Sequence, residues 1–268
     1  MPRARADRVY WDGAWAQGAL PAAVDPRVRS VKTYPERALH RYFERIFSTL
    51  RSGERRLLEI GCARSAWLPY FAKVHGFQVT GIDYSEVGCR QAREILAATG
   101  ADGTIVCADV FRPPPSLSAG FDVVVSFGVV EHYEDTAGCV RALAGFARPG
   151  GLVVTLVPNL AGLVGLVQRV INRPVFDRHV VLDREALRAA HEGAGLSVVE
   201  CDYFLFTHFG VCNLLGLRPG TVGWAVKRGL LGALCRASMA VWGLEMATGP
   251  LRANRLTSPY VICTARRD

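Results

Sequence analysis

The sequence predicts an α/β fold in which a doubly wound, mostly parallel sheet of seven strands carries helical insertions. Strand-like segments near 56–61, 77–82, 104–109, 121–127 and 151–157 alternate with helix-like segments near 66–75, 85–99 and 136–147. This alternation is typical of a parallel sheet with helices on both faces. The run FDVVVSFG at 121–128 is almost continuously apolar, as expected for a strand that is covered on both sides.

The remaining elements lie at the two ends of the chain. Strands six and seven are expected at 196–204 and 259–266, after a helix at 183–192. Residues 1–54 are expected to form an N-terminal helical cap, and residues 55–268 the main domain. The cap contains an amphipathic helix within 31–50. Ahead of that helix, a leader with three aromatic residues between positions 10 and 15 either docks on the core or folds over a bound ligand.

The composition is that of one large folded domain, because half of the 268 residues are hydrophobic. The net charge of +8 comes almost entirely from scattered arginines, so codon usage explains it better than an anionic partner. The eight cysteines are dispersed without a C-x-x-C pair, which favours reduced thiols and a cytoplasmic location. We see no apolar leader and no run of about 20 uninterrupted apolar residues, and therefore expect neither a signal peptide nor a spanning helix.

The segment from Arg56 to Tyr70, RLLEIGCARSAWLPY, combines an apolar strand, a turn of small residues and a helix. Gly61 begins the turn, and Ser65 is placed to cap the helix. Asp83, 22 positions after Gly61, ends the next strand. Such an arrangement forms a cradle for a nucleoside, in which the carboxylate accepts hydrogen bonds from the ribose hydroxyls. Because Ala63 and Ser65 replace the glycines that a pyrophosphate needs, the turn favours a cofactor without phosphates.

The chain resembles the class I S-adenosylmethionine (SAM)-dependent methyltransferases, whose first motif reads E/D-x-G-x-G-x-G. Glu59 and Gly61 match this motif, and its two later glycines are absent. Three further landmarks come in the order of the family. They are Asp109 after the third strand, a Glu-His pair after the fourth, and a Pro-Gly-Gly turn before the fifth. The resemblance implies a Rossmann-like methyltransferase fold that binds SAM and releases S-adenosylhomocysteine.

The resemblance covers roughly residues 55–204 and 259–266 and implies a set of site residues. Asp83 is expected at the ribose and Asp109 at the adenine amino group. His132 is expected near the transferring methyl group, either as a general base or as a structural residue beside Glu131. The residues expected to bind the cofactor are Tyr10, Trp15, Glu59, Gly61, Cys62, Ala63, Asp83, Tyr84, Ser85, Asp109, Val110, Phe111, Ser126, Phe127 and Gly128.

Two apolar insertions, 160–179 and 205–257, exceed the bare fold. Additions of this kind commonly build substrate pockets at the carboxyl edge of such a sheet. Our first expectation is that they form a substrate lid. A dimer face is the second alternative and a membrane contact is the third. Each insertion contributes one histidine, His179 or His208, that is placed either to reach the pocket from above or to pack.

The expected function is methyl transfer from SAM to an oxygen or nitrogen atom of a small hydrophobic acceptor. An arginine- and alanine-rich chain with apolar pocket insertions fits the biosynthetic tailoring of bacterial secondary metabolites such as antibiotics. One alternative is a quinone or lipid methyltransferase that works at a membrane surface, and another is a SAM-binding module without catalysis. A nucleic-acid partner is not expected, because the site after strand four reads Ser126-Phe127-Gly128 instead of an Asn-Pro-Pro-Tyr-like motif. A metal is not expected either, since Asp135 is the only extra acid near that strand's end.

Overall fold

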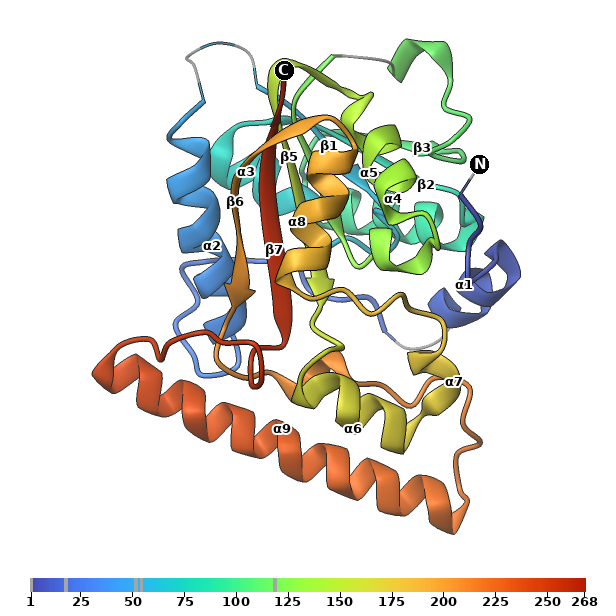
Figure 1. Cartoon of the computed structure of the whole chain (residues 1–268), viewed down its shortest axis with the longest axis vertical. Helices are drawn as coiled ribbons and strands as arrows, with labels where there is room; N and C mark the ends of the chain where they lie inside the picture. Colours follow the sequence, from blue (N-terminus) through green and yellow to red (C-terminus); the bar gives the residue numbers. More distant parts are fainter. Residues whose placement is uncertain (1, 17–18, 51–52, 54, 118–119) are drawn as a thin grey trace.

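A computed structural model describes residues 2–16, 19–50, 53, 55–117 and 120–268. Its seven strands form one sheet in the order β3-β2-β1-β4-β5-β7-β6 (Figure 1). β7 runs antiparallel to both β5 and β6, and the other pairs are parallel. The strands are β1 (Arg56–Ile60), β2 (Gln78–Asp83), β3 (Gly103–Cys107), β4 (Phe121–Phe127), β5 (Ala147–Pro158), β6 (Leu196–Phe204) and β7 (Tyr260–Arg267). The predicted seven-stranded, mostly parallel sheet is confirmed.

Helices cover both faces of the sheet. On one face, α2 and α3 pack an aromatic-rich cluster that includes Phe43, Phe47 and Phe71. On the other face, α5 and α8 contribute Leu143 and Leu187 to a second cluster, and Figure 1 shows both helices in front of the sheet. The helices are α1 (Arg8–Trp15), α2 (Tyr34–Phe47), α3 (Leu68–His75), α4 (Glu86–Thr99), α5 (Thr136–Ala144), α6 (Leu163–Ile171), α7 (Arg173–Phe176), α8 (Arg184–Gly193) and α9 (Val222–Thr248), with 3-10 turns η1 (Pro115–Leu117), η2 (Val130–His132) and η3 (Phe209–Val211).

Several element boundaries differ from those expected. The helix after β1 begins at Leu68 instead of 66, and its N-cap residue is Trp67, whose own side chain makes no cap hydrogen bond. Ser65 Oγ accepts the backbone N–H groups of Trp67 and Leu68 at 3.1 and 3.0 Å, so Ser65 satisfies free N–H groups at the start of the helix, as predicted, from two positions before the N-cap residue. β5 begins at Ala147, so the Pro-Gly-Gly turn lies within a strand whose register shifts against β4. The expected boundary of the N-terminal cap falls at residue 54, which lies outside the described residues.

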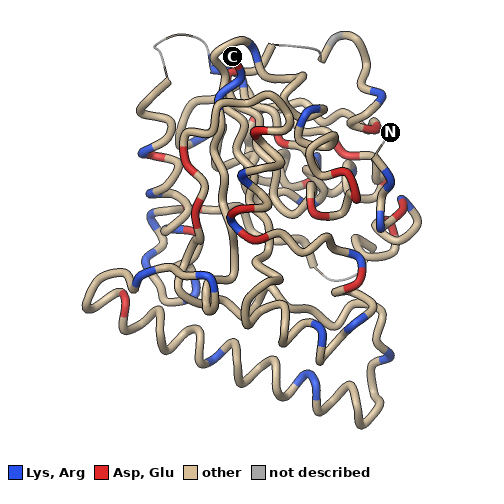
Figure 2. Tube along the Cα trace, viewed as in Figure 1, with Lys and Arg blue, Asp and Glu red and all other residues tan. Residues whose placement is uncertain are grey.

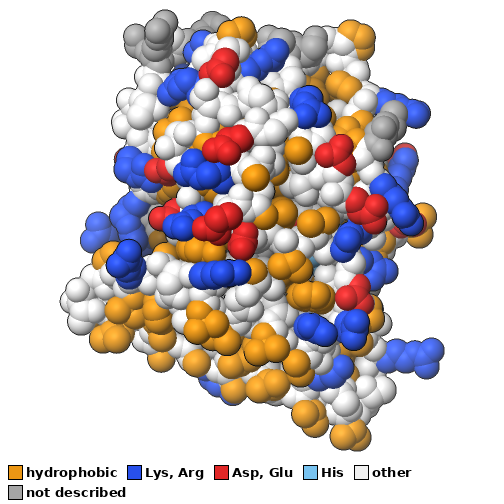
Figure 3. Space-filling view, viewed as in Figure 1, with side chains coloured by type: hydrophobic (Ala, Val, Ile, Leu, Met, Phe, Trp, Pro, Cys, Tyr) orange, Lys and Arg blue, Asp and Glu red, His pale blue; other side chains and the backbone are white. Residues whose placement is uncertain are grey.

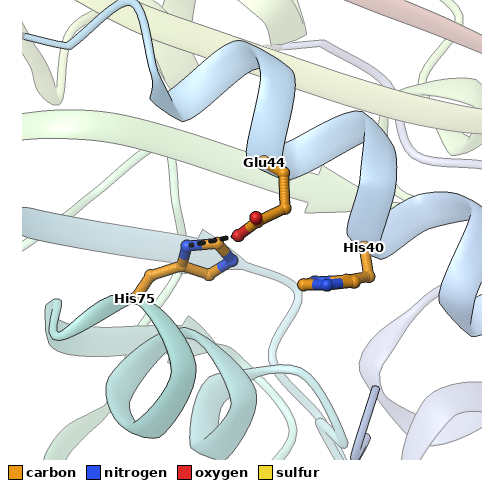
Figure 4. A group of neighbouring side chains, drawn as sticks. All are labelled: His40, Glu44 and His75. Carbon is orange, nitrogen blue, oxygen red and sulfur yellow. Dashed lines mark ion pairs between the residues drawn. The ribbon is translucent and has the colours of Figure 1, made fainter. Parts of the chain in front are cut away.

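A polar cluster joins α2 to α3 (Figure 4). His40 and Glu44 come from α2, and His75 comes from the end of α3. The Tyr70 hydroxyl lies 2.8 Å from His40 Nδ1 and 2.8 Å from His75 Nε2. On the other side of its ring, His75 Nδ1 lies 3.7 Å from Glu44 Oε1. These contacts attach the N-terminal helix α2 to the helix that follows the first strand.

The two insertions pack together at one end of the molecule, where Figure 1 shows α9 running beneath α6. α9 has 27 residues, of which Ser238, Trp242 and Glu245 are buried. The Trp242 indole donates a hydrogen bond to the carbonyl oxygen of Thr207 at 2.8 Å. By length and composition alone, α9 would be able to cross a membrane, and 17% of its tested stretch is buried. The expectation that no helix spans a membrane stays a prediction, because length and composition alone do not place α9 in a bilayer.

Candidate functional site

The main cavity lies at the carboxyl ends of β1, β2 and β4 and has a volume of about 520 Å³. The strand order reverses between β1 and β4, so the chain leaves these two neighbouring strands in opposite directions along the sheet. Such sheets bind ligands at this point. The predicted site residues that line the cavity are Trp15, Glu59, Gly61, Ala63, Asp83, Tyr84, Asp109, Val110, Phe111, Phe127, Gly128 and His132. Tyr10, Cys62, Ser85, Ser126 and Glu131 are not among the lining residues.

The turn after β1 is held by a buried carboxyl group. Ser65 Oγ donates a hydrogen bond to Glu59 Oε2 at 2.7 Å, and the same oxygen then caps α3. Burial raises the pKa of Glu59 to about 8. Gly61 has a φ of +75°, and a Cβ atom on it would lie 2.5 Å from Val129 Cγ2. A glycine is therefore required at the closest approach of the β1 and β4 turns.

Asp83 is fixed between the turns that follow β1 and β2. Its Oδ2 accepts the Ala63 N–H at 3.1 Å, and its Oδ1 accepts the Ser85 N–H at 2.8 Å. Burial raises the pKa of Asp83, and these backbone hydrogen bonds act in the opposite direction. Each carboxylate oxygen keeps a second lone pair, so this cavity-lining group has acceptor capacity for a ligand's hydroxyls.

The aromatic leader forms part of the cavity wall. Trp11 and Trp15 of α1 both line the cavity, and their rings stack with centroids 5.3 Å apart. α1 is attached to the helix after β2, since Ser85 Oγ donates to Asp12 Oδ1 at 2.5 Å and Gln91 Nε2 donates to the Trp15 carbonyl oxygen at 2.8 Å. The leader was expected either to dock on the core or to fold over a bound ligand. Its position in the cavity wall agrees with the second alternative.

Sequence reasoning missed several lining residues, and one signal would have found some of them. Trp11 belongs to the same aromatic run as Trp15, and its ring lies edge-on to His132 at 5.0 Å. Other missed lining residues lie at or directly after the carboxyl ends of strands β1 to β4. Their position in the chain would have identified them, as it identified the predicted residues beside them. The lining residues that were not among the predicted catalytic or cofactor-binding residues are Pro2, Ala4, Ala6, Asp7, Trp11, Pro21, Ile60, Arg64, Ser65, Ala66, Trp67, Ile82, Ala108, Val129 and Tyr133.

His132 and Glu131 lie on η2, directly after β4. His132 Nδ1 lies 3.0 Å from the carbonyl oxygen of Arg178, which assigns the proton of the neutral ring to Nδ1. Burial lowers the pKa of His132 to about 3 and raises the pKa of Glu131 to about 8. A histidine with so low a pKa accepts a proton poorly near neutral pH, so its general-base role stays a prediction. Its neutral ring offers a lone pair on Nε2.

The two insertion histidines have different surroundings. His179 packs on His132 with ring centroids 4.4 Å apart, so the insertion 160–179 reaches the edge of the cavity. His208 instead contacts Trp242 at 4.9 Å, beside α9. No residue of 160–179 or 205–257 is among the residues that line the cavity in the described chain. The lid role of these insertions stays a prediction.

Comparison with known proteins identifies the family. The methyltransferase-domain family matches residues 28–201, more than half of the chain. A ubiquinone biosynthesis O-methyltransferase of Bordetella bronchiseptica is 32% identical over 150 residues, which are 53% of this chain and 62% of that protein. The 27-O-demethylrifamycin SV methyltransferase of Amycolatopsis mediterranei is 34% identical over 127 residues, 45% of this chain and 46% of that protein. The chain thus spans less than two thirds of these relatives.

Solved structures share the fold at low sequence identity. A SAM-dependent methyltransferase from Archaeoglobus fulgidus has a TM-score of 0.55 and 20% identity, over 89% of this chain and 95% of that one. The [4+2]-cyclase SpnF has a TM-score of 0.59 and 16% identity, over 99% of this chain and 96% of that one. Since one of these proteins is described as a cyclase, the fold alone does not decide the reaction.

Proposed function

Because the chain belongs to the methyltransferase-domain family, as a class I SAM-dependent methyltransferase, we propose that it methylates a hydroxyl oxygen of a small hydrophobic acceptor. The observation that carries this proposal is the main cavity, which Asp83 and His132 both line. We assign the ribose of SAM to Asp83 and the acceptor to the neighbourhood of His132. Both named relatives above are O-methyltransferases or act on an O-demethylated compound, which supports oxygen over nitrogen.

The walls of the cavity support an apolar acceptor. Trp11, Trp67, Phe111 and Phe127 all contribute to its lining, and aromatic walls bury planar apolar molecules well. Methyl transfer from a sulfonium ion needs alignment and a dry site more than it needs proton transfer. A secondary metabolite is our proposed acceptor class. A reducing, cytoplasmic setting is also proposed, because all eight cysteines are free.

The test is a methyl-transfer assay with isotopically labelled SAM and matched acceptors. Polycyclic phenols are compared with the corresponding arylamines, and S-adenosylhomocysteine release is measured alongside. Turnover of phenols with loss of activity in Asp83→Asn supports the proposal. Turnover restricted to the amines overturns the choice of oxygen. Tight SAM binding without release of S-adenosylhomocysteine across the panel favours the non-catalytic module.

A second candidate function, methylation at a membrane surface, is favoured by the outward side of α9. Val222, Val226, Leu230 and Leu244 are 82, 65, 47 and 53% exposed. At 3.6 residues per turn, these four lie within a sector of about 80°, whose centre is roughly 130° around the helix from that of the buried Ser238, Trp242 and Glu245. Leu166 and Val170 of α6 are also exposed, and Figure 3 shows a continuous hydrophobic area over α6 and α9. An apolar area of this kind on a folded protein marks an interaction surface.

The charges beside this α6–α9 face favour an anionic bilayer over a second copy of the chain. α9 carries Lys227, Arg228 and Arg236, and its one acid, Glu245, is 4% exposed. Figure 2 shows further basic residues on the segments around α6 and α9. A symmetric dimer through this face would place like charges against each other, whereas anionic phospholipid headgroups attract them. We therefore propose an anionic membrane surface as the partner of the α6–α9 face.

Vesicle sedimentation tests this candidate. The protein is expected to pellet with vesicles of phosphatidylglycerol and to stay in solution with vesicles of phosphatidylcholine. The variant Val226→Glu/Leu230→Glu is expected to lose most of the pelleted fraction, whereas Val199→Glu, on the exposed face of β6, keeps it. The membrane candidate is refuted if the wild-type protein does not pellet with either kind of vesicle. If its molar mass in solution also doubles as the protein concentration rises, this face is a dimer interface.

A further inference from the structure

Three side chains beside the main cavity carry the donor atoms of a metal site. Glu131 and His132 lie on η2, and His179 lies beyond α7, 47 positions after His132 in the chain. One donor atom of each residue lies within 4.8 Å of the donor atoms of the other two. Bonds of about 2.0–2.2 Å at the tetrahedral angle hold two ligand atoms roughly 3.4 Å apart, so side-chain shifts of about 1 Å close the site.

The hydrogen bonds of both histidines leave the same ring nitrogen open. Nδ1 of His132 lies 3.0 Å from the Arg178 carbonyl oxygen, and Nδ1 of His179 lies 2.8 Å from the Val175 carbonyl oxygen. Because a carbonyl oxygen only accepts, Nδ1 of each neutral ring carries the proton and Nε2 keeps its lone pair. Backbone carbonyls orient metal-binding histidines in proteins in this manner. Within the described part of the chain, neither Nε2 has a hydrogen-bond partner.

The carboxyl group of Glu131 is the second observation that points to a cation. Its side chain is 1% exposed, and Oε2 has no hydrogen-bond partner among the described residues. A buried carboxylate without a partner is strongly disfavoured, and a bound cation removes that penalty.

We propose that Glu131, His132 and His179 bind one divalent transition-metal ion, with zinc as the best match. Two imidazole nitrogens and one carboxylate oxygen suit zinc, whereas magnesium prefers a set of oxygen ligands. Because His132 lines the main cavity, the proposed ion would lie beside that cavity. The sequence did not predict this site, since His179 is distant in the chain and belongs to an insertion.

The proposed ion deepens the proposed function, on which its chemical role rests. A hydroxyl oxygen bound to zinc loses its proton more readily, and that proton leaves to solvent. A lone pair of the oxygen then forms the bond to the methyl carbon of SAM. The carbon–sulfur bond breaks, and its electron pair stays on the sulfur of S-adenosylhomocysteine. His132 acts in this reaction as a ligand of the ion and not as the base.

The cluster of His40, Glu44 and His75 in Figure 4 provides a matched control. It also consists of one glutamate and two histidines, but the Tyr70 hydroxyl already bonds a nitrogen of each histidine. Glu44 is also 57% exposed, so its carboxylate is solvated. This second cluster therefore lacks the orphaned buried carboxyl group that marks the proposed site.

Calorimetric titration of chelator-treated protein with ZnCl2 tests the proposal without an activity assay. One equivalent of zinc is expected to bind, with MgCl2 much weaker. Glu131→Gln and His179→Gln are each expected to weaken zinc binding at least tenfold, because altering groups that merely support a ligand already costs that much. His40→Gln is expected to leave it unchanged. Near-ultraviolet circular dichroism and SAM titration of the same variants establish that the fold and the cofactor site are intact.

Two results overturn the metal site. Zinc affinity that is equal in wild type, Glu131→Gln and His179→Gln shows that the ion binds elsewhere or not at all. Zinc binding that is lost in His40→Gln but kept in His179→Gln moves the site to the other cluster. Failure of the wild-type protein to bind SAM would refute the proposed function, and the zinc titration would still report separately on the metal site.

Discussion

Replacing Gly61 with alanine should destabilise the fold more than the same change at Gly76. Both glycines have positive φ, +75° and +67°, so both substitutions force an alanine into the left-handed region at a cost of about 1–2 kcal/mol. At Gly76 a Cβ atom meets nothing within 4 Å. At Gly61 it lies 2.5 Å from Val129 Cγ2, which adds an overpacking cost of about 1–3 kcal/mol. We therefore expect Gly61→Ala to lose about 2–5 kcal/mol in total.

Urea unfolding measures both variants, and a double-mutant cycle isolates the clash. Val129→Ala removes the atom that Gly61→Ala would strike, so the two changes should couple favourably by about 1–3 kcal/mol. SAM affinity, measured by calorimetry, should fall at least threefold in Gly61→Ala, because Gly61 and Val129 both line the cavity. Gly76→Ala should bind SAM normally. Equal destabilisation of the two single variants, with no coupling to Val129→Ala, would refute this reasoning.

Three further outcomes are expected. Asp83→Asn should weaken SAM binding by about 1–3 kcal/mol in calorimetry, because an amide cannot accept hydrogen bonds at both positions; unchanged affinity would remove Asp83 from the ribose site. Burial raises the pKa of Glu59 to about 8, so the native state keeps a proton that the unfolded state releases, and stability should fall as pH rises from about 4.5 to 8. Glu59→Gln should flatten that part of the urea-midpoint profile, and an equally steep profile in the variant would contradict the assignment. Trp242→Phe should lower the free energy of unfolding by about 0.5–1.5 kcal/mol through loss of its hydrogen bond to Thr207, and a thermal scan that shows no change would mean that α9 is held by other contacts.

Local sequence patterns were sufficient to predict the sheet and to predict that the residues at the ends of its first two strands lie together. Glu59, Gly61 and Asp83 each lie at or just after a strand end, and the carboxyl ends of neighbouring parallel strands meet at one edge. Their position in space therefore follows from their position in the chain. The Ser65 cap was predictable for the same reason, since a cap involves residues within one helical turn.

Tertiary packing decided which residues surround Glu131 and His132. The leader's aromatic residues were visible in the sequence, but only folding places Trp11 against His132. His179 meets Glu131 and His132 because the chain returns to η2 after α7, where the Val180 N–H donates to the Glu131 carbonyl oxygen at 2.6 Å. No periodicity encodes such a contact, because it depends on the path of an insertion.

The sequence by itself determined the α/β sheet, the turns that follow its first two strands and the presence of two apolar insertions, because strand alternation, turn residues and hydrophobicity are properties of short segments. Only the tertiary structure decided which side of α9 is buried. Its apolar residues are spread around much of the helix, and Trp242 and Ser238 select the side that packs on the body. The side that carries Val222, Val226, Leu230 and Leu244 stays exposed, because no other segment of the described residues packs over it.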